Sequence, residues 1–222
     1  MDLIILAIIA IFVALRLRSE LGKISEEEKE NIAEKINQNS KIQTNYNTKP
    51  TQENSSSENN IIVINHDDKY LENLDEKNKT SVIAIMNRCS ITIDFFISGA
   101  KSAFEMVIES FAKENFENLE MLLSEKVFQE FKKSIEERRG LQKILNTNLI
   151  AIENIEIINA LLDKNQAFIT LKIKSKQINY ITNFNSEVIE GNKSNISQLT
   201  DIWTFRRDID SANPNWKISA TS

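Results

Sequence analysis

The sequence predicts an α+β domain in which helices pack on a curved antiparallel sheet, and three observations support this fold class. Apolar residues recur at helical spacing between residues 100 and 135. After Gly140 the pattern changes to alternating apolar and polar residues, which is typical of strands with one solvated face. Helices come first and strands last, an order that favours segregated element types within one domain.

The first helix of this domain is predicted by a stripe on one helix face. The stripe consists of Ala100, Ala103, Phe104, Val107, Ile108 and Phe111, at i, i+3, i+4 and i+7 spacing. Lys101, Glu105 and Glu109 fall off that face. The stripe has two interpretations, a core face and a membrane contact. We favour the core face, because a membrane-binding helix would be basic on its polar side and this one is not.

Two further helices are expected before the sheet. A break at residues 114–115 precedes a short helix that carries Leu119, Leu122 and Leu123. Ser124 has the residue type and position of an N-cap for the next helix. That helix should bury Val127, Phe128, Phe131 and Ile135. It should stop at Gly140, because two arginines followed by glycine are typical of a helix end.

Strands are expected from residue 168 onward, and residues 151–162 before them are rich in Ile. Residues 168–174 alternate, and residues 177–184 either extend that strand or begin the next. Residues 185–195 are expected to be a turn region. Two more strands are predicted at 201–207, with Trp203 and Phe205 on one face, and at 216–220, with Trp216 and Ile218 on one side.

Composition excludes several classes of enzyme before any motif is considered. The chain has 222 residues and a net charge of −5, with one His, one Cys and four Gly. Cys89 alone cannot form an internal disulfide, and His66 alone cannot supply a multi-His metal site. Scattered glycines cannot build a phosphate-binding loop. The negative charge argues against a nucleic-acid partner. We therefore expect no catalytic residues, no metal and no cofactor.

Residues 1–18 are expected to anchor the chain in a membrane. An unbroken apolar run extends from Leu3 to Leu15, and Arg16 and Arg18 follow it directly. A helix through this segment would be only about 25 Å long, so arginine snorkelling and local bilayer thinning would have to make up the difference. A cleaved signal peptide and an interfacial helix are the alternatives. Basic residues follow the run here, whereas they precede it in a signal peptide.

The flanking charges predict the orientation of this anchor. The excess of Lys and Arg lies on the C-terminal side of the run, so the positive-inside rule places the rest of the chain in the cytoplasm. The expected anchor residues are Leu3, Ile4, Ile5, Leu6, Ile8, Ile9, Ile11, Phe12, Val13, Leu15, Arg16 and Arg18.

Residues 19–80 are expected to be a polar, mostly disordered linker. Ser25 opens a capping box that predicts one short helix. Residues 37–60 are too polar to bury the apolar surface that ordering requires. The apolar residues 61–64 are either a docking strand or a stretch without function. His66, beside two Asp residues, is either a metal ligand or an ordinary linker residue. We favour a stretch without function for residues 61–64 and an ordinary linker residue for His66.

Several strings, taken in order, resemble one domain family over about residues 90–222. FISGAKSAFEMV (residues 96–107) is similar to that family's opening helix, and LEMLLSEKVFQEF (residues 119–131) is similar to its second and third helices. TDIWTFRRD (residues 200–208), followed by NPNWK (residues 213–217), is the most specific part. Together these strings resemble the C-terminal domain of mitochondrial import inner membrane translocase subunit 44 and its bacterial relatives.

The resemblance implies a cone-shaped, nuclear-transport-factor-two-like fold with an apolar pocket. In mitochondria the family protein is a peripheral inner-membrane scaffold on the matrix side. It binds lipid and tethers a heat-shock chaperone to the import channel. The matrix corresponds to the bacterial cytoplasm, in agreement with the orientation predicted from charge. The mitochondrial protein has a long N-terminal region that engages chaperone and channel, whereas residues 19–80 here are short, polar and mostly without pattern, so chaperone tethering stays open for this chain.

Candidate pocket residues are apolar side chains of the predicted helices and strands, and the aromatic ones have a second interpretation as plain core. The candidates are Phe104, Val107, Phe128, Phe131, Ile169, Leu171, Trp203, Phe205 and Trp216. For the three strand aromatics Trp203, Phe205 and Trp216, the core interpretation is favoured. The expected division of the chain is an anchor at 1–18, a linker at 19–80 and the α+β domain at 81–222.

The preferred function is that of a non-catalytic, single-pass binding or scaffold protein of the bacterial inner membrane. It would assist protein translocation or envelope protein assembly, with membrane lipid and membrane or translocating proteins as partners. Two alternatives stay open. One is a lipid or small-molecule carrier that uses the apolar pocket. The other is a catalytic pocket, because a fold does not determine a function.

Overall fold

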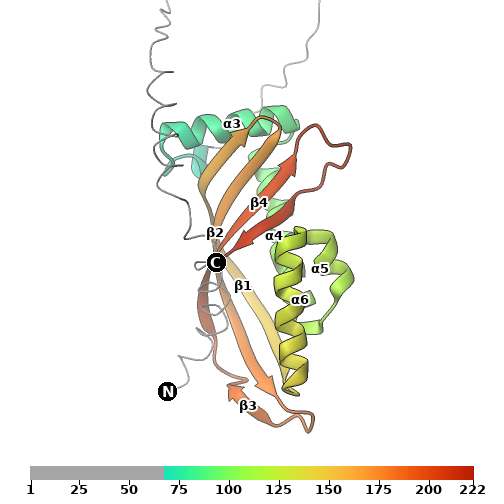
Figure 1. Ribbon diagram of the computed structural model, residues 1–222. Coiled ribbons are helices and arrows are strands. Elements are labelled where there is room, and N and C mark those ends of the chain that lie inside the picture. The colour runs from blue at the N-terminus through green and yellow to red at the C-terminus, as the bar shows by residue number, and fades with distance from the viewer. Residues whose placement is uncertain (1–67) are drawn as a thin grey trace, which may run out of the picture.

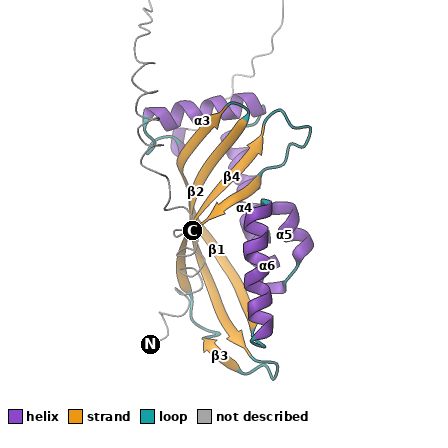
Figure 2. Ribbon diagram, in the orientation of Figure 1, coloured by secondary structure: helices purple, strands orange, loops and turns teal. Residues whose placement is uncertain are grey.

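A computed structural model describes residues 68–222 of the chain. In this part of the chain, helices α3 to α6 pack on an antiparallel sheet (Figure 1, Figure 2). The α+β prediction, with helices preceding a single sheet, is therefore confirmed. The expected membrane anchor and almost all of the expected linker lie outside the described residues, as does His66.

The sheet has five strands and is built around one long hairpin. β1 and β2 pair along nearly their whole lengths, β4 and β5 continue the sheet in that order, and β3 pairs with the end of β2. The pairing of β1 with β2 contains three register shifts, each a β-bulge or a local irregularity, and β-bulges bend strands and increase their twist. The strand bounds are β1 Ile144–Asp163, β2 Gln166–Thr182, β3 Val188–Gly191, β4 Ser197–Asp208 and β5 Lys217–Thr221.

Four α-helices cover this sheet, preceded by a short 3-10 turn. The turn η1 spans Asp68–Tyr70, and the helices are α3 Glu76–Cys89, α4 Ile93–Lys113, α5 Phe116–Leu122 and α6 Glu125–Gly140. Helix α3 lies across one end of the β1–β2 hairpin (Figure 1). There the guanidinium of Arg88 donates to the carbonyl of Lys164, at 2.6 Å, and to the side-chain oxygen of Asn165, at 3.1 Å.

The helical stripe predicted from sequence faces the core. Ala100, Phe104 and Val107 of α4 are buried, and the remaining stripe residues are half-buried against the same cluster. The rings of Phe104 and Trp203 lie 4.7 Å apart, which joins α4 to the middle of β4. The core interpretation of this stripe therefore holds, because the sheet supplies the apolar surface that covers it.

Several predicted boundaries agree with the structure. The break at residues 114–115 separates α4 from α5, and Gly140 is the last residue of α6. Residues 177–184 largely extend β2 and do not start a new strand. Ser124 occupies the N-cap of α6, but its side chain makes no capping hydrogen bond there. Its backbone N–H donates to the carbonyl of Ile218, so the residue links α6 to β5.

Three expectations need correction. The domain does not begin at 81, because α3 begins at Glu76 and Leu71 and Leu74 are already part of the buried core. Residues 185–195 are not only turn, since they contain β3. Trp216 lies just before β5, not within it, although it packs against the core beside Phe96.

No single helix in residues 68–222 is both long and apolar enough to cross a membrane. Helices α3 and α4 are long and apolar enough only when taken together, and the two are bent by 87° at their junction.

Candidate functional site

The sheet and the helices α4 and α6 enclose a cavity of about 180 Å³ that opens to solvent. Its helical wall is apolar and consists mainly of Val107, Ile108 and Phe111 from α4 and Phe131 from α6. Trp203 and Leu199 of β4 and Leu145 of β1 extend the apolar lining onto the sheet. The cavity is thus formed by parts of the chain that are far apart in sequence.

The sheet side of the cavity changes from apolar to polar along β2 and β4. Inward-facing residues alternate with outward-facing ones, since side chains in a strand point to opposite faces in turn. In β2 the inward series of Ile169, Leu171 and Ile173 continues into Ser175, Gln177 and Asn179. In β4 the series of Phe205 and Trp203 continues into Asp201. Gln177, Asn179 and Asp201 all line the cavity.

The amides of this polar side are ordered by hydrogen bonds along β2. The Asn179 Nδ2 donates to Gln177 Oε1 at 3.2 Å, and Gln177 Nε2 donates to Ser175 Oγ at 2.9 Å. These two hydrogen bonds use N–H donors of Asn179 and Gln177, but they provide no donor for the side-chain oxygen of Asn179. Asn179 Oδ1 is buried and has no hydrogen-bond partner.

Asp201 is the most perturbed acid in the described residues. Its Oδ2 is buried without a hydrogen-bond partner, and the side chain forms none of the ion pairs seen in residues 68–222. Burial raises the pKa of the Asp201 carboxyl to about 6, because the low-dielectric surroundings disfavour the charged form. The carboxyl is therefore mostly ionised at neutral pH and poorly solvated.

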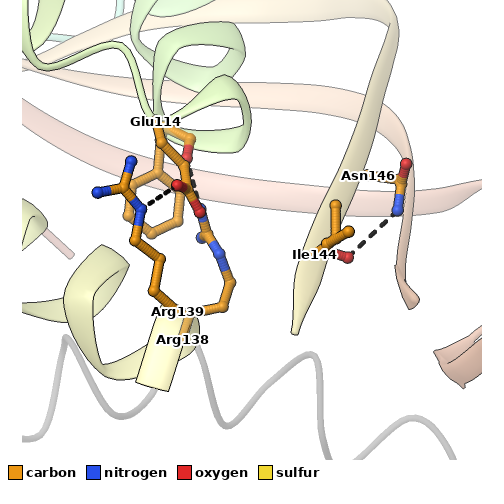
Figure 3. Close-up of polar contacts among 6 residues, drawn as sticks. Glu114, Arg138, Arg139, Ile144 and Asn146 are labelled. Atoms are coloured by element: carbon orange, nitrogen blue, oxygen red, sulfur yellow. Dashed lines mark hydrogen bonds and ion pairs between the residues drawn. The ribbon is translucent and has the colours of Figure 1, made fainter. Parts of the chain in front are cut away.

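An ion-pair cluster holds the helical wall of the cavity in place. Glu114, the C-cap of α4, pairs with Arg138 at 3.3 Å and also with Arg139, both in the last turn of α6. Figure 3 shows both guanidinium groups turned toward Glu114. Arg138 also donates to the carbonyl of Phe111 at 2.9 Å, and its guanidinium lies 4.9 Å from the centre of that ring.

Because Phe111 lines the cavity, this cluster fixes one of its walls. Burial lowers the pKa of the Arg138 guanidinium, while its hydrogen bond to Glu114 raises it in part. The guanidinium stays charged, because the ordinary pKa of an arginine side chain is so high.

The nine candidate pocket residues fall in three places. Val107, Phe131 and Trp203 line the cavity. Phe205 and Trp216 line a separate groove along the N-terminal half of α4, beside the exposed Phe95 and Met121. The other four lie in the core and line neither space; they are Phe104, Phe128, Ile169 and Leu171.

Sequence reasoning missed the polar side of the cavity. Asp201 stands two residues before Trp203 in a strand, so period-two alternation places both on one face. That signal was available for Asp201, and Gln177 and Asn179 follow from the same rule applied to β2. The anchor residues between Leu3 and Arg18 stay predictions, because they lie outside the described part of the chain.

Cys89 is a structural thiol within the described residues. It is buried at the end of α3, and burial raises the pKa of its thiol, with Arg207 and Arg88 opposing that effect. A thiol held in its protonated form is a poor nucleophile. In residues 68–222 no group of three or more His, Cys, Asp or Glu side chains is arranged to hold a metal ion.

The fold and the cavity define a class of protein, that of α+β domains in which helices and a bent antiparallel sheet enclose a small apolar pocket. Comparison with known families identifies the particular one. Residues 83–222 match the family model of the Tim44-like domain, and the chain belongs to this family. The resemblance predicted from the sequence is thereby confirmed.

Among solved structures, the crystal structure of the intermembrane space region of chloroplast protein ARC6 is similar. The alignment covers 56% of this chain and 93% of that chain, with 12% sequence identity and a TM-score of 0.39. No curated protein matches the chain.

Proposed function

We propose that the protein is a non-catalytic binding or scaffold protein of the bacterial inner membrane, anchored by residues 1–18 with its Tim44-like domain in the cytoplasm. There it assists protein translocation or envelope protein assembly. The observation that carries this proposal is the family membership of residues 83–222. The apolar run from Leu3 to Leu15 and the arginines that follow it support the anchoring and the orientation.

The chemistry of the cavity supports a binding role. Two carboxylates, Asp201 and Glu130, line it, and none of its lining residues is a His, Cys, Lys or Arg. General acid–base work needs a group positioned against a reacting atom, and nucleophilic catalysis needs an activated nucleophile beside a base. An apolar space with one buried carboxylate suits the holding of a ligand better than its conversion.

Crosslinking in cells tests the scaffold role. A photoreactive amino acid is placed at Phe95, which is 68% exposed, and at Gln142, an exposed residue in the turn after α6, as a second position. The proposal predicts adducts with membrane proteins or with newly made proteins in transit. Recovery of adducts with abundant soluble enzymes alone, at both positions, contradicts it.

Membrane attachment is tested separately with a variant of the apolar run. Ile8→Arg combined with Ile9→Arg places two charges in the run, at a cost of about 2.5–3.5 kcal/mol each in a membrane helix. The full chain should stay with the membrane after alkaline carbonate washing, and the double variant should be released. Ser19→Arg, outside the run, is the matched control and should behave as the unaltered chain.

A second candidate function is that of a carrier for a lipid or a small molecule, and the apolar cavity is the observation that favours it. Native mass spectrometry of the purified full chain should then show a co-purified ligand. A mass equal to that of the chain alone argues against a carrier without affecting the scaffold proposal.

A further inference from the structure

The cavity has an apolar wall and a polar side whose acceptors are not satisfied. Asp201 Oδ2 and Asn179 Oδ1 are buried and lack hydrogen-bond partners in the described residues. Both residues line the cavity together with the apolar side chains of α4 and α6. A buried acceptor without a donor costs free energy. A ligand that donates hydrogen bonds to these two oxygens removes that cost, and this favours its binding.

The charges around the cavity favour a cationic donor. Asp201 is mostly ionised at neutral pH, and Glu130 of α6 adds a second carboxylate to the lining. No Lys or Arg is among the lining residues, and Asp201 forms no ion pair within residues 68–222. A carboxylate in poorly solvated surroundings attracts a cation more strongly than it would in water and repels an anion.

The size of the cavity limits the ligand. Its volume is about 180 Å³, somewhat larger than the roughly 150 Å³ of an apolar protein cavity that admits benzene. A chain of a few methylene groups therefore fits between Val107, Phe131 and Trp203. A primary ammonium group at its end carries three donors, enough for both open acceptors.

From this arrangement we infer that the cavity binds a small alkylamine, with its ammonium group paired to Asp201 and Asn179 and its chain against α4, α6 and Trp203. This inference rests on the cavity being a binding site, the second candidate above, and does not depend on membrane anchoring. It names a ligand class, a free primary amine on a short apolar chain.

Binding is measured on the full chain in lipid nanodiscs with three probes of equal chain length, n-pentylamine, 1-pentanol and pentanoate. The chain has two tryptophans, so a Trp216→Phe background leaves Trp203 in the cavity as the reporter of fluorescence. Empty nanodiscs correct for partition into lipid. Near neutral pH we expect n-pentylamine to bind about tenfold more tightly than pentanoate and severalfold more tightly than 1-pentanol.

Two variants locate the site and its charge. Asp201→Asn keeps the shape but removes the charge, so the three probes should then bind within about twofold of one another. Asp208→Asn, at an exposed position of the same strand, is the matched control and should leave the preference unchanged. Thr147→Phe fills the cavity from β1 and should weaken all three probes together.

Equal affinities in the unaltered chain, a preference that survives Asp201→Asn, or binding unaffected by Thr147→Phe each overturn the inference, as does the absence of binding. N-acetyl-lysine methylamide carries the same ammonium group on a peptide-like body. If it binds as tightly as n-pentylamine, the cavity belongs to the lysine of a protein partner and the assignment to a free amine is wrong. None of these outcomes bears on membrane attachment, which the carbonate wash tests.

Discussion

Replacing Asp201 with Asn should stabilise the protein at neutral and alkaline pH. The carboxyl is held in the wall of the cavity with Oδ2 unpartnered, and burial raises its pKa from a usual 3.8 to about 6. At a pH between these two pKa values, the Asp201 carboxyl is protonated in the folded chain and ionised in the unfolded chain. Asp201 therefore lowers the free energy of unfolding as the pH rises through this window.

The magnitude follows from the two pKa values. A change from 3.8 to about 6 corresponds to about 3 kcal/mol, fully present above pH 6 and nearly absent below pH 4. Asn still leaves a polar amide in the cavity wall, which offsets part of the gain. We expect Asp201→Asn to raise the free energy of unfolding by about 1–3 kcal/mol at pH 8, and to change it little at pH 4.

Urea unfolding of the full chain in nanodiscs, followed by tryptophan fluorescence, measures this difference at a series of pH values. Both tryptophans lie in the Tim44-like domain, so the signal reports that domain. Glu130 also lines the cavity and is present in both proteins. Asp208→Asn should show no pH-dependent gain. A difference that is constant across pH, or a loss of stability at pH 8, refutes the reasoning about Asp201.

Four further substitutions test the packing, the ion-pair cluster and the backbone conformation. Trp203→Ala should cost about 3–5 kcal/mol in urea unfolding, because Trp203 is only 3% exposed; a cost below about 1 kcal/mol would show that it is not core. Glu114→Gln should cost about 1–2 kcal/mol by leaving the half-buried Arg138 without its charge partner, and an unchanged midpoint would mean that the cluster is not structural. Gly191→Ala should lose about 1–3 kcal/mol, since Gly191 has φ +75° and an added Cβ would lie 2.6 Å from the Asn179 carbonyl. Gly99→Ala, on an open helix surface, should gain about 0.5–1 kcal/mol, and the opposite order of the two would contradict the backbone assignment.

Elements with a clear period could be predicted from the sequence. Two such patterns are the α4 stripe ending at Phe111 and the alternation of residues 168–174. Both predict an element with one buried face, and in the structure these faces belong to the hydrophobic core. The ends of α4 and α6 could be predicted too, because breaks at residues 114–115 and at Gly140 use residues with local conformational preferences.

Elements that depend on distant parts of the chain could not be predicted. β3 lies within a segment rich in turn-forming residues, and only its pairing with residues 180–182 of β2 orders it as a strand. The start of the domain could not be predicted either, because Leu71 and Leu74 are isolated in a polar segment of the sequence and only the folded structure shows that they belong to the buried core. Boundaries set by tertiary burial leave little local signal.

Only the apolar part of the cavity could be predicted from the sequence. Its apolar wall follows from the helical stripes, whereas its sheet side depends on how β1, β2 and β4 pair, with three register shifts between β1 and β2. Asp201 looks like an ordinary surface carboxylate until the inward face of β4 is extended past Trp203. The strand register and any β-bulge determine which side chains meet across the sheet, and neither can be predicted from the sequence of one strand alone.

The central claim is that a Tim44-like binding domain works at the cytoplasmic face of a membrane to which residues 1–18 hold it. The most direct measurement is protease digestion of intact spheroplasts and of inverted membrane vesicles, with an epitope tag attached after Ser222 and a carbonate wash of a separate membrane sample. We predict that the tagged domain is protected in intact spheroplasts and digested in inverted membrane vesicles. Digestion in spheroplasts, or loss of the chain from the membrane during the wash, would contradict the claim.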